Sequence, residues 1–128
     1  MLTQTEAISR GQPDRLGTEL QEISNAMVRI YKQLFGRGPT VARSAYAGRD
    51  TLIVTLENSL TRAERNLVAC GQRQWVEETR AVFQAAAERD FVQTVEAITG
   101  RRVRAFVSGT DTAHDVSTEI FYLEPEAE

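Results

Sequence analysis

Cysteine and histidine, two residue types common in nucleophilic catalysis, each occur once in the chain, as Cys70 and His114. A covalent mechanism needs a thiol or a hydroxyl next to a base, and the positions of these two residues give no sign that they meet. Cys70 precedes Gly71 in a stretch of buried character, where cysteine usually packs as a small apolar side chain. His114 lies in a polar loop. We therefore expect no catalytic residue and predict that the protein is not an enzyme.

Asp111, His114 and Asp115 are the one compact set of possible metal ligands in the sequence. Carboxylate and imidazole groups bind cations in many proteins, but this loop lacks the spacing of a calcium-binding EF-hand. Aspartate side chains in a polar loop more often accept hydrogen bonds from the backbone of their own turn. We therefore predict no metal site and no cofactor, with weak metal binding as the alternative.

Four arginines are the candidate residues for binding a ligand or a partner: Arg37, Arg43, Arg49 and Arg102. Arg37 lies in a Gly-Arg-Gly-Pro turn at residues 36–39, which lacks the spacing and the lysine of a phosphate-binding P-loop. The turn follows the C-terminal end of a predicted helix, where the macrodipole favours a basic side chain over a bound anion. Arg37 is therefore predicted to complement the helix end. The alternative is a module that senses a small anion or a nucleotide.

RNA binding is the second alternative that basic residues raise, because Arg101, Arg102 and Arg104 cluster at the start of a predicted strand. Sheet-based RNA readers stack bases on exposed aromatic side chains, and the predicted strands offer few of these. The chain has 15 basic and 18 acidic residues, so no overall field attracts nucleic acid or anionic membranes. Pairs of Arg and Glu on neighbouring strands explain the charges more simply. Nucleic acid is therefore not an expected partner.

An amphipathic helix is predicted to lead into the turn that carries Arg37. From Leu20, apolar residues recur at three- and four-residue steps as far as Leu34. Thr18 and Gln21 have the spacing of a capping box, which favours a helix start there. At the other end, Gly36 suits the left-handed position that terminates many helices.

Two β-hairpins are predicted to carry the other arginines. The first joins Val41–Tyr46 to Thr51–Glu57, where apolar and polar residues alternate except at Ile53, which indicates some cover on the second face. The second hairpin has strands at residues 102–107 and 116–123 around a polar connection.

Two helices are predicted between the hairpins. Thr61 and Glu64 form a capping box for a short helix that ends near Gly71. A longer helix is predicted over residues 72–99, and its apolar residues fall in pairs, which makes its apolar face wider than one sheet requires. This extra width over residues 75–98 predicts a homodimer or a groove for a partner.

These elements predict an α+β fold: a four-stranded, mainly antiparallel sheet of two hairpins, with elements in the order α-β-β-α-α-β-β. With 128 residues, 41% of them hydrophobic, the chain suits one domain. We assign residues 16–124 to this domain, residues 1–15 to a mobile N-terminal tail and residues 125–128 to a C-terminal tail. The N-terminus lacks the apolar core of a signal peptide, and no stretch is apolar enough to span a bilayer. We therefore expect a cytoplasmic protein without membrane insertion.

Four segments occur in the order typical of one bacterial family: RIYKQLFGRGPT at residues 29–40, TLIVTLE at 51–57, LTRAE at 60–64 and TGRRV at 99–103. With this order and spacing the chain resembles the MpsC-like family over residues 16–124. That family is named for a component of a sodium-translocating, membrane-potential-generating system also tied to inorganic carbon uptake. The resemblance implies a non-catalytic accessory or regulatory protein that meets the cytoplasmic face of a membrane complex for cation or inorganic carbon transport.

Overall fold

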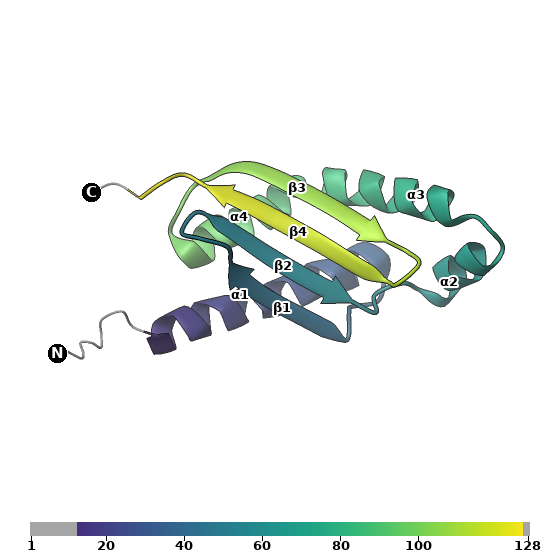
Figure 1. Ribbon diagram of the computed structural model, residues 1–128, viewed down its shortest axis with the longest axis horizontal. Helices are drawn as coiled ribbons and strands as arrows, with labels where there is room; N and C mark the ends of the chain where they lie inside the picture. Colours follow the sequence, from purple (N-terminus) through teal and green to yellow (C-terminus); the bar gives the residue numbers. More distant parts are fainter. Residues whose placement is uncertain (1–12, 127–128) are drawn as a thin grey trace.

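The computed structural model describes residues 13–126, which form an α+β fold. The elements are α1 (Pro13–Phe35), β1 (Val41–Tyr46), β2 (Thr51–Glu57), α2 (Arg62–Ala69), α3 (Arg73–Ala86), α4 (Glu88–Thr99), β3 (Val103–Asp111) and β4 (Val116–Leu123). The strands form one sheet in the order β1-β2-β4-β3, and every neighbouring pair is antiparallel. The predicted fold class is confirmed, with three helices rather than two between the hairpins (Figure 1).

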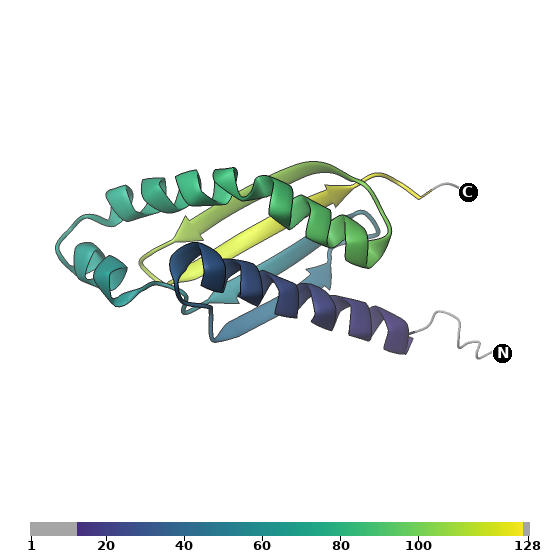
Figure 2. The same ribbon diagram turned by 180° about the vertical axis from the view of Figure 1, so that it is seen from behind.

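The described helices cover only one face of the sheet. Figure 2 shows α1, α3 and α4 in front of the strands, whereas Figure 1 shows the opposite face with no helix in front of it. Along β2 and β4, buried side chains alternate with half-buried ones. The buried ones, such as Leu56 and Phe121, form the core with Ile23 and Met27 of α1 and Phe91 of α4. The half-buried ones belong to the opposite face, which we call the open face.

Helix α1 begins earlier than predicted. Its first residue is Pro13, so residues 13–15, assigned to the tail, lie in its first turn, and Thr18 lies inside the helix rather than at its cap. Proline at the first helical position has a φ angle already suited to the helix and lacks an N–H that would need a partner, which explains the earlier start. Residues 1–12 and 127–128 of the predicted tails lie outside the described residues.

Helix α1 ends where the sequence predicts. Gly36 follows its last residue with a φ angle of 79°, and the Gly36 N–H donates to the carbonyl of Lys32 at 2.9 Å. Residues other than glycine are strained at this φ angle. Apart from its two chain neighbours, no residue has an atom within 4 Å of the place where a Cβ would be, so the constraint at Gly36 is one of backbone conformation.

We predict that Gly36→Val lowers the free energy of unfolding by about 1–2 kcal/mol, because a β-branched side chain is strained at positive φ. Urea unfolding measures the loss. Gly36→Asn is the matched control and should lose less, because asparagine tolerates this conformation. A valine variant as stable as the wild type would contradict the assignment of the helix end.

The prediction of one long helix over residues 72–99 was wrong in one respect, because the structure has two helices there. α3 ends at Ala86 and α4 begins at Glu88, with Ala87 between them at φ −95° and ψ 4°. Ala87 is buried in the core. The change of direction at Ala87 lets α3 run along β3 while α4 packs beside α1 (Figure 2).

Strand β3 is longer than predicted. Residues 108–111, assigned to the polar connection, pair with residues 116–119 of β4 and extend the hairpin. Within this extension the hydroxyls of Thr110 and Ser117 face each other at 3.0 Å. The connection itself is only residues 112–115.

Candidate partner-binding groove

The four predicted binding arginines do not share one site. Arg37 donates from Nη1 to the carbonyl of Leu60 at 2.5 Å, which ties the end of α1 to the segment before α2. Arg37 therefore lies just after the end of α1, and its side chain also links α1 to the segment before α2. Arg43 forms an ion pair with Glu57 at 2.9 Å between β1 and β2, which confirms the predicted pairing of Arg with Glu on neighbouring strands.

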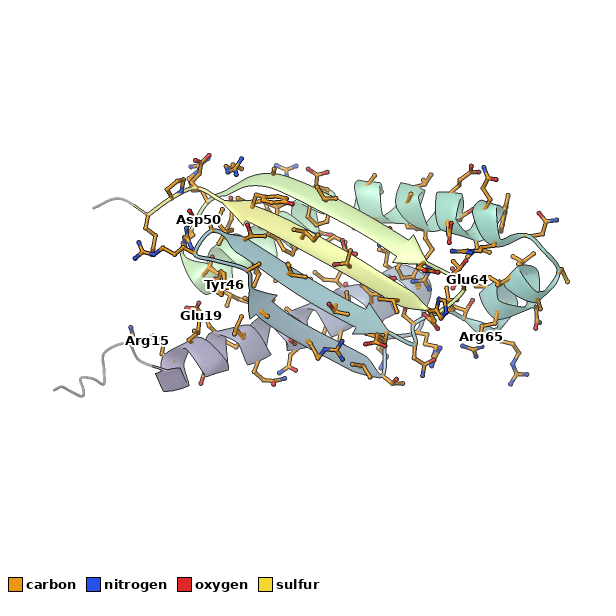
Figure 3. All side chains as sticks on the ribbon, in the orientation of Figure 1. Arg15, Glu19, Tyr46, Asp50, Glu64 and Arg65 are labelled. Carbon is orange, nitrogen blue, oxygen red and sulfur yellow. The ribbon has the colours of Figure 1, made fainter. Side chains whose placement is uncertain are left out.

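Arg49 and Arg102 lie at the other end of the sheet, in the turn between β1 and β2 and just before β3. Arg101 joins the loops there, because it donates to the carboxylate of Asp50 at 2.5 Å and to the carbonyl of Arg49 at 2.8 Å. Figure 3 shows Asp50 at this end of the sheet and Glu64 at the opposite end. The predicted arginines are thus spread over the length of the molecule.

A hollow of about 330 Å³ lies beside Arg49 and Arg101, and its lining also contains the acidic residues Glu19 and Glu126. A lining of mixed charge gives an anion little net attraction, because the carboxylates offset the field of the guanidinium groups. These arginines therefore provide no converging cationic surface.

Cys70 is exposed, and the expectation that it is buried was wrong. The physical reason is the position of α2, which precedes it: none of the residues of this helix is buried. Apolar residues in the segment, such as Leu67, are only half-buried and face a groove rather than the core.

Two aspartates, one at the end of β3 and one just before β4, accept hydrogen bonds from backbone N–H groups. Asp111 accepts the N–H of Ala113 at 2.9 Å, which confirms the predicted turn, and Asp115 accepts the N–H of Ser59 at 2.9 Å. The exposed His114 lies 3.8 Å from Asp111. The protein's own donors thus occupy the carboxylates that sequence alone offered as possible metal ligands.

Helix α3 has an inverted distribution of polar and apolar residues. The side that faces the core carries Arg80 and Gln84, which are 0% and 2% exposed. The other side carries Trp75, Val82 and Phe83, which are 54%, 68% and 44% exposed. A surface helix normally arranges such residues the other way round, and clustered exposed apolar side chains mark interaction sites. We call Trp75, Val82 and Phe83 the α3 stripe.

Arg80 is stable in the interior because its neighbours satisfy the guanidinium group. Nε and Nη2 donate to the two carboxylate oxygens of Glu64 at 2.8 and 2.7 Å, and Nη1 and Nη2 donate to Oγ and the carbonyl of Ser59, both at 3.0 Å. The guanidinium carbon lies 3.7 Å from the centre of the Phe35 ring, a cation–π contact. This network fixes α3 against α1 and the start of α2.

Glu64 also starts α2 through the predicted capping box, which is confirmed. Its Oε1 accepts the N–H of Thr61 at 2.8 Å, and Oγ1 of Thr61 accepts the N–H of Glu64 at 3.1 Å. Burial raises the pKa of Glu64, but the hydrogen bonds from Arg80 and Thr61 outweigh burial and hold the pKa below its ordinary value. Glu64 is therefore ionised at neutral pH.

A groove opens between the end of α1, helix α2 and the α3 stripe. Its volume is about 310 Å³, and its lining is mostly apolar. The lining includes Leu34 and Phe35 from α1, Ala63 and Leu67 from α2, and Trp75 and Phe83 from α3. Amphipathic helices of partner proteins bind in apolar grooves of this kind. Two α3 stripe residues, Trp75 and Phe83, therefore form part of a concave apolar surface.

A buried polar cluster lies deeper in the molecule, between α1, α3 and β4. Oε2 of Glu119 accepts hydrogen bonds from the Tyr31 hydroxyl at 2.6 Å and from Nε2 of Gln84 at 2.9 Å. Oε1 of Glu119 and the hydroxyl of Ser108 are buried without a hydrogen-bond partner among the described residues. Burial raises the pKa of Glu119 to about 7 and also raises the pKa of Tyr31. Glu119 and Tyr31 are fully buried, so the cluster offers a substrate no access.

Sequence reasoning missed Arg80, Gln84 and Glu119, although a signal for each was present. Arg80 and Gln84 follow Val76 at four-residue steps, which places all three on one side of a helix. Glu119 stands two residues before the core residue Phe121, and residues two apart on a strand share a face. The helical and strand periods therefore assign these polar residues to the core side.

Comparisons with known proteins place the chain in one family. A family model described as "Na+-translocating membrane potential-generating system (MpsC)" matches residues 17–125. Comparison with curated proteins gave no match, and neither did comparison with solved structures. Within residues 13–126, no helix combines the length and the apolar composition needed to cross a membrane. The matched range contains all four strands and the complete groove.

Proposed function

We propose that this chain, which belongs to the MpsC family, is a non-catalytic accessory protein. In this proposal it regulates a Na+-translocating membrane system by binding another component of that system. Membership of the family links the chain to the Na+-translocating membrane potential-generating system. In this proposal the chain is cytoplasmic and meets its partner outside the bilayer. The link to inorganic carbon uptake implied by the resemblance stays a prediction.

The observation that carries the proposal is the α3 stripe and the groove beside it. An aromatic side chain buries about 150–250 Å² when it is covered completely, so the exposed parts of Trp75 and Phe83 offer on the order of 200 Å². This area is well below the roughly 800 Å² per partner of a standard interface between two folded proteins. It suits a single amphipathic helix, whose apolar side chains enter a groove at helical spacing.

The two alternatives, anion or nucleotide sensing and RNA binding, draw no support from the arrangement of the basic residues. Both require several cationic groups that act on one ligand. Arg37 and Arg43 are engaged with Leu60 and Glu57, respectively. Neither alternative has an observation that favours it over binding in the groove.

The proposal predicts that Trp75→Glu weakens binding to the membrane system at least about tenfold, because the substitution places a charge in the apolar lining of the groove. Trp75 is 54% exposed, so the variant should fold normally. Binding is measured by co-sedimentation of the purified chain with membrane vesicles that contain the Na+-translocating system. Vesicles from cells without that system provide the background.

Leu16→Glu is the matched control, because Leu16 is also an exposed apolar residue but lies near the start of α1, away from the groove. It should bind like the wild type. Equal binding of the wild type to both kinds of vesicle would contradict the proposed function. Equal binding of Trp75→Glu and the wild type would contradict the assignment of the groove.

A further inference from the structure

The open face of the sheet is a second unpartnered surface, separate from the groove. None of the described helices covers it (Figure 1). Successive residues of a strand point to opposite faces of the sheet. Every second residue of each of the four strands therefore contributes a side chain to the open face. Ile53 of β2, noted in the sequence as a break in the alternation, belongs to this face and is half-buried.

An apolar row crosses the open face from edge to edge. The strand register aligns Ala45 of β1 with Ile53 of β2, Ile53 with Ile120 of β4, and Ile120 with Val107 of β3. Val107 is 51% exposed. Four aligned apolar side chains without a described cover are unusual, because the solvated face of an antiparallel sheet normally carries polar residues. The row therefore indicates a surface that another molecule covers.

The charges near this row are few and largely compensated. The next row pairs Thr55 with Thr118, which are uncharged, and its edge residue Arg43 is neutralised by Glu57 at 2.9 Å. The guanidinium of Arg104 lies 5.7 Å from the centre of the Tyr122 ring. Two identical copies of a nearly neutral face meet without strong like-charge repulsion, which otherwise costs several kcal/mol.

The size of the open face suits a second folded copy better than a peptide. Neighbouring strands lie about 4.8 Å apart and rise about 3.3 Å per residue. The four strands have 6 to 9 residues, so the face measures roughly 20 by 25 Å, on the order of 500 Å² per copy. Two such faces bury about 1,000 Å², the lower limit expected of a biological interface.

We propose that two copies of this chain pack face to face through their open faces, with the row formed by Ala45, Ile53, Ile120 and Val107 at the centre. Two sheets then stack about 10 Å apart, as in a β-sandwich, and two-fold symmetry brings the same patch of each copy into contact. The homodimer predicted from residues 75–98 therefore forms through a different surface. The groove of each copy stays free, so this inference is independent of the proposed function.

The test compares the mass of the full chain in solution with that of three variants, by light scattering over a range of concentrations. The wild type should show about twice the monomer mass of 14.3 kDa at tens of micromolar. Val107→Glu should raise the dimer dissociation constant at least about 100-fold, because two-fold symmetry places two charges in the apolar contact. Ala45→Glu, at the other edge of the row, should do the same. Val82→Glu on α3 should leave the dimer intact.

Circular dichroism and thermal unfolding establish whether each variant folds. If either Val107→Glu or Ala45→Glu does not fold, the other variant still tests the interface. A wild type that stays at 14.3 kDa up to about 100 µM would overturn the proposal. So would a dimer that is lost in Val82→Glu and retained in Val107→Glu. Binding of a fluorescent single-stranded RNA that Val107→Glu abolishes would assign the open face to RNA instead.

Discussion

Arg80→Leu is expected to lower the free energy of unfolding by about 3–5 kcal/mol, the usual cost of removing one partner of a buried ion pair. The substitution leaves the carboxylate of Glu64, which is only 18% exposed, without its bidentate donor. It also leaves the hydroxyl and carbonyl of Ser59 without the donors that satisfy them. Urea unfolding at pH 7 measures the loss.

The double variant Arg80→Leu with Glu64→Gln is the control for this prediction. Glutamine keeps the capping box that starts α2 and removes the uncompensated charge. The double variant should therefore recover part of the stability lost in Arg80→Leu, because a buried ion pair replaced as a whole costs much less than one that is broken. A loss below about 1 kcal/mol in the single variant would show that Arg80 does not hold α3 in place.

Glu119→Gln is expected to stabilise the protein at pH 8 by roughly 3 kcal/mol and to change its stability little at pH 5. In the folded protein the pKa of Glu119 is raised from 4.5 to about 7. The folded state therefore holds a proton that the unfolded state has lost, and wild-type stability falls as the pH rises from about 4.5 to 7. Glutamine removes this loss because it does not ionise, and its amide can donate to the unpartnered Ser108 hydroxyl.

Urea unfolding at a series of pH values from 5 to 8 tests this prediction. The other titratable residue that contacts Glu119 is Tyr31, whose raised pKa keeps it neutral throughout this range. A difference between wild type and variant that grows with pH is therefore assigned to Glu119. Parallel pH profiles for the two proteins would contradict a raised pKa at this position.

Local signals in the sequence were sufficient for most of the secondary structure. The alternation in Thr51–Glu57 predicted β2 with its observed bounds, and the spacing of Thr61 and Glu64 predicted the start of α2. Gly36 marked the end of α1 because only glycine adopts its φ angle without strain. Each of these features depends on residues close together in the chain, which is why one sequence sufficed to predict them.

Features set by contacts between distant elements were not predicted. The break at Ala87 carries no Gly or Pro, and it follows from α3 packing on β3 while α4 packs on α1. The hydrogen-bond partners of Arg80 and Gln84, Ser59 and Glu119, lie on other elements. The helical period places Arg80 and Gln84 on the side of Val76, but the partners that make their burial stable can be known only from the fold.

The most direct test of the proposed function is the Na+-driven membrane potential of vesicles from cells that lack this chain. A voltage-sensitive dye reports the potential before and after the purified protein is added on the cytoplasmic side. We expect the wild type and Leu16→Glu to change the potential equally, and Trp75→Glu, in the lining of the groove, to have at most about one tenth of that effect at the same concentration. A full effect of Trp75→Glu would contradict the account of the groove, and no effect of the wild type would contradict the accessory function itself.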